Sequence, residues 1–132
     1  MKQHHVLVVG GGSIGERHVR CFGQTGRATI SVCEINETLR ERVATEYGAA
    51  EAFGDFASAM ASKPEVAVVC TPANLHVQMA TELAAAGVHV LCEKPLSVEL
   101  DGVDDLVKPV ARTGVTFAVA YVLSLIHICR CR

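Results

Sequence analysis

Two charged side chains follow a short apolar segment directly and precede a proline, in the order Cys92-Glu93-Lys94-Pro95. A carboxylate can accept hydrogen bonds from sugar hydroxyls. A lysine ammonium can hydrogen-bond a substrate oxygen on which negative charge develops during hydride transfer. Proline restricts the backbone that carries both groups, which limits their misplacement. The pattern favours Lys94 as a catalytic residue and Glu93 and Lys94 as cofactor-binding residues. Taken alone, an exposed ion pair before a turn is the alternative.

A glycine-rich stretch near the N-terminus fits the pattern G-x-G-x-x-G, with the residues Gly10-Gly11-Gly12-Ser13-Ile14-Gly15. It follows a predicted strand and opens a predicted helix, which is the context that a dinucleotide-binding turn requires. Gly10 permits the tight turn, Gly12 lets a pyrophosphate approach the backbone, and Gly15 allows the helix to pack on the strand. Free N–H groups at the helix start, including those of Ser13 and Ile14, favour an anion. We therefore expect these residues to bind a dinucleotide.

An acidic residue, Glu34, follows the second predicted strand and lies 19 positions after Gly15 (34 − 15). This is the spacing at which a carboxylate binds the hydroxyls of the adenosine ribose. Such a carboxylate repels a 2′-phosphate, so NAD is favoured over NADP. A solvated acid before a helix cap is the alternative, and Arg40 or Arg42 could still pair with a phosphate.

The segment after the fourth predicted strand, Thr71-Pro72-Ala73-Asn74-Leu75-His76, has residues suited to a binding loop. Thr71 and Pro72 end the strand in a fixed turn, and Asn74 or one of its neighbours can cap the next helix. His76 falls in the first turn of that helix, near the expected cleft. We predict cofactor contacts for these four residues, although a lone histidine there is more often a packing or surface residue.

Apolar segments alternate with helical patterns along the whole chain. The sequence predicts strands at 5–9, 28–33, 49–53, 66–70, 88–92 and 115–120. Helices are predicted at 14–24, from a cap at Asn36 to Gly48, from Asp55 to before Lys63-Pro64, around 75–86, and from a cap at Ser97, with Pro109 ending the last one early. This alternation indicates an α/β fold, a Rossmann-type doubly wound parallel sheet in a single domain.

Composition narrows the class of protein. The 132 residues carry a net charge of −2, so nucleic acid is not an expected partner. No apolar run is long enough for a membrane span, and the N-terminus lacks a signal-peptide pattern, so we expect a cytoplasmic protein without membrane contact. Cysteines in such a chain are free thiols, and Cys21, Cys33, Cys70 and Cys92 are predicted core residues. We expect no metal site.

These residues together resemble the Gfo/Idh/MocA family, named for glucose-fructose oxidoreductase, inositol dehydrogenase and a rhizopine-catabolism protein. The matching parts are residues 10–18, Glu34, Thr71-Pro72 with His76, and residues 87–96. The resemblance covers about residues 4–122, which is the nucleotide-binding domain of the family. The Glu93-Lys94-Pro95 element is its most specific part.

The resemblance implies an NAD(P)-dependent oxidoreductase that acts on a sugar, cyclitol or similar polyol-like substrate. It implies that Lys94 is catalytic, that Glu93 binds the nicotinamide ribose, and that the Lys94–Pro95 peptide is cis. The full-length protein is then expected to form a homo-oligomer and to carry a second, substrate-binding domain. A non-catalytic NAD-binding or redox-sensing module and an NAD-dependent glycosidase remain alternatives. By itself the chain is expected to lack turnover.

The resemblance ends near residue 122. We expect residues 1–122 to form the NAD(P)-binding domain and residues 123–132 to be a tail that is not native. Residues 123–128 can be encoded by the reverse complement of a transposon mosaic end used in sequencing libraries. On this hypothesis Cys129 and Cys131 are not metal ligands.

Overall fold

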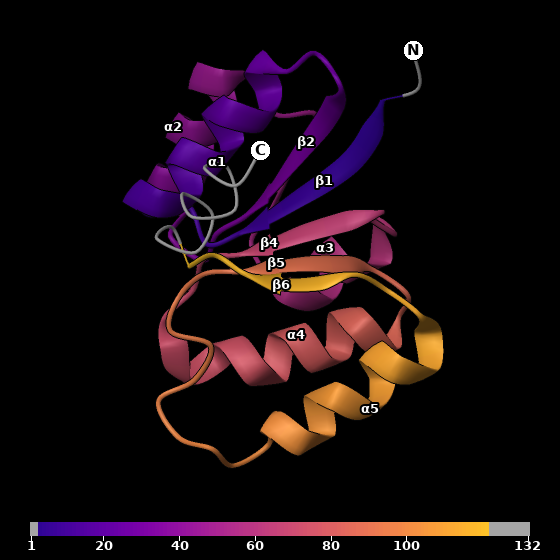
Figure 1. Ribbon diagram of the computed structural model, residues 1–132. Coiled ribbons are helices and arrows are strands. Elements are labelled where there is room, and N and C mark those ends of the chain that lie inside the picture. Colours follow the sequence, from indigo (N-terminus) through magenta and orange to yellow (C-terminus); the bar gives the residue numbers. More distant parts are fainter. Residues whose placement is uncertain (1–2, 122–132) are drawn as a thin grey trace, which may run out of the picture.

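A computed structural model describes residues 3–121 and shows one six-stranded sheet with all strands parallel (Figure 1). The strand order is β3-β2-β1-β4-β5-β6, so the direction of winding reverses between β1 and β4. The strands are β1 (His4–Val9), β2 (Ala28–Cys33), β3 (Glu51–Phe53), β4 (Val66–Val69), β5 (His89–Cys92) and β6 (Phe117–Val119). The predicted Rossmann-type fold is confirmed.

Helices cover both faces of the sheet. They are α1 (Ser13–Gln24), α2 (Glu37–Tyr47), α3 (Phe56–Ala61), α4 (His76–Ala85) and α5 (Val103–Thr113), with a short 3-10 turn, η1 (Ala73–Leu75), before α4. Helices α1 and α2 lie on one face, whereas α4 and α5 lie on the other (Figure 1). Helix α3 packs with the second group, because Ala59 belongs to the same buried cluster as the α4 residue Leu83.

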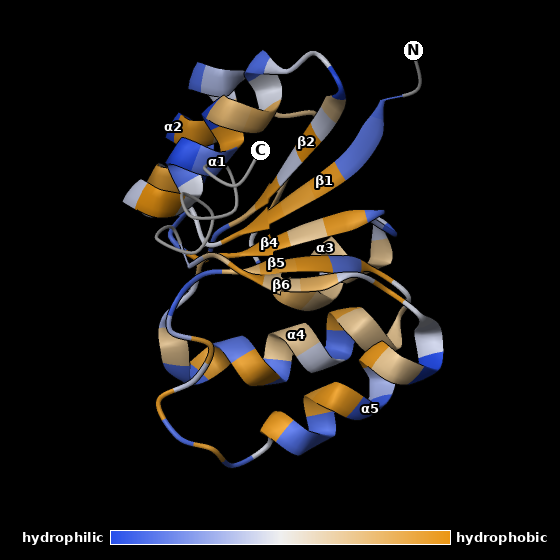
Figure 2. Cartoon of the chain, viewed as in Figure 1, coloured by the Kyte–Doolittle hydropathy of each residue, from blue (hydrophilic) through white to orange (hydrophobic). Residues whose placement is uncertain are grey.

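The core consists of two apolar clusters separated by the sheet. Side chains of successive strand residues point to opposite faces. In β1, Leu7 and Val9 therefore join the cluster under α3, α4 and α5, while Val6 and Val8 join the cluster under α1 and α2. Figure 2 shows the resulting apolar colouring of most of the central strands, with hydrophilic residues at the starts of β1 and β5. Burial on both faces of the sheet explains why apolar and polar residues do not alternate within the central strands.

Local signals set several helix ends as predicted. The Asn36 side chain accepts a hydrogen bond from the Leu39 N–H at 2.9 Å, which caps α2. Gly48 ends that helix with φ = 64°, a conformation that glycine adopts without steric cost. Asp55 caps α3 by accepting from the Ser58 N–H at 2.8 Å.

The prediction for the last helix was wrong at both ends. The Ser97 side chain accepts from the Glu99 N–H at 3.1 Å within a local turn, and α5 begins only at Val103, after Gly102 adopts φ = 81°. Pro109 does not end the helix. It lacks only the N–H that would bond the Asp105 carbonyl, it is buried, and α5 continues to Thr113.

The cysteine prediction was correct only in part. Cys33 and Cys92 are buried, and Cys70 is half-buried against the α1–α2 cluster. Cys21 is exposed on α1, because only one face of that helix reaches the sheet. All four thiols are free, as predicted.

Candidate functional site

The carboxyl ends of the strands form one row across the sheet. Residue pairing places Val9 beside Cys33 and Val69, and Cys92 beside Val69 and Val119. The residues that follow each strand therefore emerge side by side at one edge. Backbone hydrogen bonds extend the row by one step, from Gly10 N–H to the Cys33 carbonyl at 2.8 Å and from Glu93 N–H to the Val69 carbonyl at 2.9 Å.

The glycine turn after β1 has the three properties that the sequence predicted. Gly10 has φ = 98°, and a Cβ there would lie 2.8 Å from the Cys70 backbone. A Cβ on Gly15 would lie 1.8 Å from the Gly10 carbonyl oxygen, so α1 can approach the turn only with glycine at this position. Gly12 instead faces open space, with no atom within 4 Å of a Cβ placed on it.

The turn leads into the N-terminus of α1, where Ser13 and Ile14 are exposed. The first N–H groups of a helix have no partner within the helix. They carry a partial positive charge that attracts an anion. The open space beside Gly12 and these N–H groups together form a cradle that fits a pyrophosphate.

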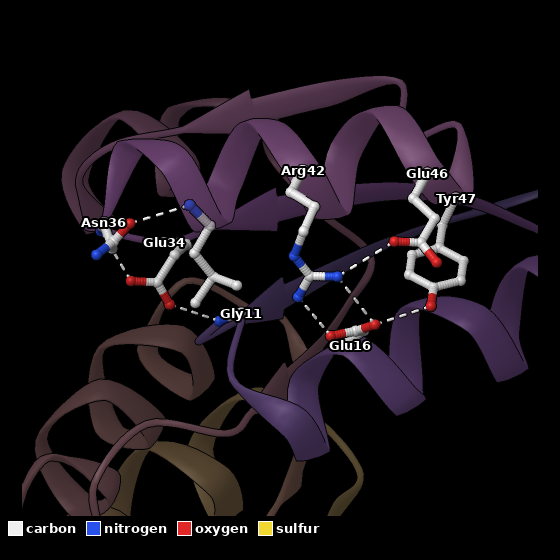
Figure 3. A network of polar contacts seen from close by, with 8 residues as sticks. Gly11, Glu16, Glu34, Asn36, Arg42, Glu46 and Tyr47 are labelled. Atoms are coloured by element: carbon white, nitrogen blue, oxygen red, sulfur yellow. Dashed lines mark hydrogen bonds and ion pairs between the residues drawn. The ribbon is translucent and has the colours of Figure 1, made fainter.

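Glu34 lies beside the glycine turn, as its spacing predicted (Figure 3). Its Oε2 accepts a hydrogen bond from the Gly11 N–H at 2.7 Å, and its Oε1 accepts from the Asn36 N–H at 2.8 Å. These two backbone donors fix the carboxylate at the end of β2. Each oxygen retains further acceptor capacity, which ribose hydroxyls could use.

A pocket of about 410 Å³ opens between the ends of β1, β2 and β4. Its lining joins the glycine turn to the predicted acid and to the loop after β4: Val9, Gly10, Gly12, Cys33, Glu34, Ile35, Leu39, Phe56, Cys70, Thr71, Pro72, Leu75 and Met79. The mixture of apolar side chains with one carboxylate suits a nucleoside. Burial raises the pKa of Cys33 to about 11 and that of Cys70 to about 12, so both thiols stay protonated at neutral pH.

Thr71 and Pro72 line this pocket, whereas Asn74 does not. Asn74 lies in η1, is exposed, and lines a separate hollow of about 530 Å³ between α4 and residues 97–105. It does not cap α4, whose N-cap is Leu75 without a side-chain hydrogen bond. The helix therefore begins after a neighbour of Asn74, which the sequence had left open as an alternative, because the 3-10 turn precedes the helix.

His76 is in the first turn of α4, as predicted, but it is 2% exposed. Its Nε2 lies 2.7 Å from the Thr71 carbonyl oxygen and its Nδ1 lies 2.8 Å from the Pro95 carbonyl oxygen. Both ring nitrogens therefore face the backbone. In this arrangement neither nitrogen points to the pocket, and His76 joins the loop after β4 to the segment after β5.

The segment Glu93-Lys94-Pro95 follows β5 at the same edge of the sheet. The Lys94–Pro95 peptide is cis, as the family resemblance implied. The Lys94 side chain is exposed, and Glu93 is half-buried. Glu93 Oε1 lies 2.8 Å from Nε2 of His18, a residue of α1, and Oε2 accepts from the Lys94 N–H at 3.3 Å.

The contact between His18 and Glu93 was not predicted. The two residues are 75 positions apart, and neither the apolar periodicity nor the glycine pattern says which α1 side chain reaches the end of β5. The only available signal was that His18 stands within the stretch resembling the family. His18 also stacks on Phe22, with ring centroids 6.2 Å apart.

A polar network joins α1 to α2 next to the site (Figure 3). Glu16 accepts hydrogen bonds from Arg42 at 2.7 Å and from the Tyr47 hydroxyl at 2.8 Å. These bonds lower the pKa of Glu16 to about 2, the Arg42 bond contributing most. The bond to Glu16, with partial burial, raises the pKa of Tyr47 to about 12. Glu46 also pairs with Arg42, so this guanidinium is committed to the network.

Other predictions concern absences or the tail. Among residues 3–121, no group of three or more histidine, cysteine or acidic side chains could hold a metal ion. No helix in this part of the chain is long and apolar enough to cross a bilayer. The predictions for residues 123–132, including Cys129 and Cys131, lie outside the described residues.

Comparison with known proteins gives consistent matches. A family model described as "Oxidoreductase family, NAD-binding Rossmann fold" (GFO_IDH_MocA) matches residues 4–121. The inositol 2-dehydrogenase of Pseudomonas savastanoi pv. phaseolicola is 32% identical over 112 residues, which are 81% of this chain and 33% of that protein. The uncharacterized oxidoreductase YrbE of Bacillus subtilis is 28% identical over 91% of this chain and 36% of its own length.

Solved structures agree with these matches. GenD2 from gentamicin A biosynthesis, in complex with NAD, is 31% identical with a TM-score of 0.78, over 90% of this chain and 34% of that one. The WlbA dehydrogenase from Bordetella pertussis, in complex with NADH and UDP-GlcNAcA, is 27% identical with a TM-score of 0.80, over 90% and 35% of the two chains. The chain thus spans about a third of the length of the relatives it matches. Because the family model matches most of its residues, the chain belongs to the Gfo/Idh/MocA oxidoreductase family and has the NAD-binding Rossmann fold of that family.

Proposed function

We propose that this chain is the dinucleotide-binding part of an NAD-dependent oxidoreductase that acts on a sugar, cyclitol or similar polyol-like substrate. One observation carries the proposal: the Glu34 carboxylate is held beside the open glycine turn, in a pocket that joins the ends of β1, β2 and β4. The substrate class is supported by relatives named inositol 2-dehydrogenase and D-glucoside 3-dehydrogenase, and by a similar structure that contains UDP-GlcNAcA.

The residues of the pocket fit the parts of a dinucleotide. The N–H groups at the start of α1 and the open approach at Gly12 would bind the pyrophosphate. Glu34 would accept hydrogen bonds from the adenosine ribose, and Thr71 and Pro72 would line the path toward β5. When bound, the nicotinamide supplies the centre that accepts or releases hydride.

The two nearby arginines support NAD rather than NADP. Arg40 donates from Nη1 to the Glu34 carbonyl at 2.8 Å, and Arg42 is bonded to Glu16 and Glu46. Both guanidinium groups therefore have partners on the protein. A 2′-phosphate would instead lie next to the Glu34 carboxylate, which repels it.

Residues after β5 would serve the reacting half of the cofactor and the substrate. Glu93 would accept hydrogen bonds from the nicotinamide ribose. The exposed ammonium of Lys94 would hydrogen-bond the substrate oxygen and stabilise the negative charge that develops there. Groups that complete the substrate pocket would come from the part of the protein that the relatives have beyond this domain, so we propose that the chain alone has no turnover.

Calorimetric titration of the chain with NAD and with NADP tests the proposal. We expect NAD to bind more tightly, and Glu34→Ala to lower NAD affinity roughly tenfold to a hundredfold, because hydrogen bonds to a charged group contribute about 1.5–3 kcal/mol. Glu37→Ala is the matched control, since Glu37 is an exposed acid three residues further on. Failure of the folded chain to bind NAD, or equal affinities for wild type and Glu34→Ala, would refute the assignment.

A further inference from the structure

Two histidines contact the segment that carries Lys94, and they come from helices on opposite faces of the sheet. His18, on α1, places Nε2 2.8 Å from Glu93 Oε1. His76, on α4, places Nδ1 2.8 Å from the Pro95 carbonyl oxygen. One histidine thus contacts the residue before Lys94 and the other contacts the residue after it.

Each contact is shielded from water. The side chains of His18 and Glu93 are 21% and 17% exposed, and His76 is 2% exposed. Low exposure strengthens a hydrogen bond because water competes less for both partners. Lys94 itself is exposed, so the backbone on either side determines where its ammonium group can reach.

We propose that His18 and His76 are positioning residues, which hold Glu93 and Pro95 and thereby fix Lys94 and the Glu93 carboxylate at the nicotinamide half of the site. This inference rests on the proposed function, because the segment matters for hydride transfer only if a nicotinamide binds beside it. It goes further by assigning roles to two residues through their contacts with the segment after β5.

The chemistry of the two rings differs in a way that an experiment can use. Carbonyl and carboxylate oxygens only accept hydrogen bonds, so a ring nitrogen that bonds one must carry an N–H, and His76 bonds both of its carbonyl partners only when both of its ring nitrogens carry one. The amide of asparagine reaches about as far as Nδ1 of histidine, and the amide of glutamine reaches about as far as Nε2. His18 uses Nε2 toward Glu93, whereas His76 uses Nδ1 toward Pro95 and Nε2 toward Thr71.

The replacement that keeps the hydrogen bond to the segment around Lys94 is therefore glutamine at position 18 and asparagine at position 76. His18→Gln retains a donor to Glu93, and His18→Asn does not. His76→Asn retains a donor to Pro95, and His76→Gln retains only the donor to Thr71. A role in general packing would make both replacements at one position equally harmful, whereas positioning predicts a difference within each pair.

Titrations of the chain with NAD and with ADP, which lacks the nicotinamide half, measure this difference. We expect His18→Asn and His76→Gln to weaken NAD binding about three- to tenfold, as for the loss of one hydrogen bond, with ADP affinity unchanged within about twofold. His18→Gln and His76→Asn should bind both ligands as wild type does. His89→Gln is the control. His89 lies at the start of β5, the strand that precedes Glu93, but it accepts a hydrogen bond from the Thr116 N–H at the opposite edge of the sheet, so this variant should bind both ligands as the wild type does.

Three outcomes decide between the proposals. Equal NAD affinities within each pair, or parallel losses for NAD and ADP, would overturn the positioning roles and leave the dinucleotide site intact. Absence of binding by the wild type for both ligands would overturn the proposed function. In that case, the amide NMR signals of Lys94 and Leu96 still test the contacts: they should shift in His18→Asn and His76→Gln and stay in place in the conservative variants.

Discussion

Three glycines, Gly12, Gly15 and Gly23, lie at the start of α1 or within it. Their surroundings differ so much that replacement by alanine should have a different effect at each position. Gly15→Ala places a Cβ 1.8 Å from the Gly10 carbonyl oxygen, where contacts under 3.0 Å do not occur. The helix would have to move away from the turn by roughly 1.2 Å. Because both clashing groups belong to the backbone, we expect a cost near the upper end of overpacking, about 3 kcal/mol. For a domain of this size that corresponds to a fall in Tm of roughly 10–15 °C.

Gly12 and Gly23 are the matched comparisons, since a Cβ at either position has no atom within 4 Å. Gly12 has φ = −62° and ψ = −175°, which any residue adopts, so Gly12→Ala should fold normally. The added methyl would occupy the approach of the pyrophosphate and weaken NAD binding roughly tenfold or more, as for the loss of a charge-assisted hydrogen bond. Gly23→Ala should raise stability by about 0.5–1 kcal/mol, because glycine is unfavourable in a helix.

Thermal unfolding followed by circular dichroism measures the first and third effects, and calorimetry with NAD measures the second. The three variants must separate: Gly15→Ala loses stability, Gly12→Ala loses affinity alone, and Gly23→Ala loses neither. If Gly15→Ala unfolded at the wild-type temperature, the close packing of α1 on the turn would be wrong. If Gly12→Ala bound NAD as tightly as the wild type, the pyrophosphate would not lie at this turn.

Three further predictions concern other parts of the domain. The lowered pKa of Glu16 makes its network stabilising above about pH 4.5, with the contribution lost as the pH falls toward 2. The raised pKa of Tyr47 makes its contribution disappear between about pH 10 and 12. The free energy of unfolding, measured across pH, should therefore lose its acid dependence in Glu16→Gln and its alkaline dependence in Tyr47→Phe. A variant whose pH profile matched that of the wild type would contradict the network. Pro109→Ala should stabilise α5 by about 1 kcal/mol in chemical denaturation, since removing a helix-interior proline gains more than the lost burial; a loss of stability would contradict this. In a longer chain that also carries a substrate domain, Lys94→Ala should abolish substrate-dependent NADH formation while NAD still binds at the Glu34 pocket, and retained turnover would show that Lys94 is not catalytic.

The parts of the site that follow strands directly could be predicted from the sequence. Parallel strands buried on both faces read as continuous apolar segments, and their carboxyl ends lie at one edge of the sheet. Gly10, Glu34, Thr71 and Glu93 stand within two residues of such ends, so their meeting required only the correct fold class. The glycine spacing was equally informative, because a Cβ at Gly10 or Gly15 would collide with nearby backbone atoms and Gly12 leaves open space beside the turn.

Contacts made by helix side chains could not be predicted in this way. Whether His18 reaches Glu93 depends on the tilt of α1 across the sheet, and the burial of His76 depends on where the segment after β5 turns. Local rules also failed where a longer-range arrangement prevailed: Ser97 forms a turn instead of a cap, and Pro109 is accommodated on the buried side of α5.

The position of the pocket follows from the reversal of strand order between β1 and β4. The chain leaves β1 toward α1 on one face and leaves β4 toward α4 on the other, so the two connections diverge (Figure 1). Divergence leaves room at the strand ends, which the lining from Gly10, Gly12, Cys70 and Thr71 surrounds. The same divergence lets α1 and α4 send one histidine each to the segment after β5. A sheet wound in one direction would place both helices on one face, and Lys94 could then be held from one side only.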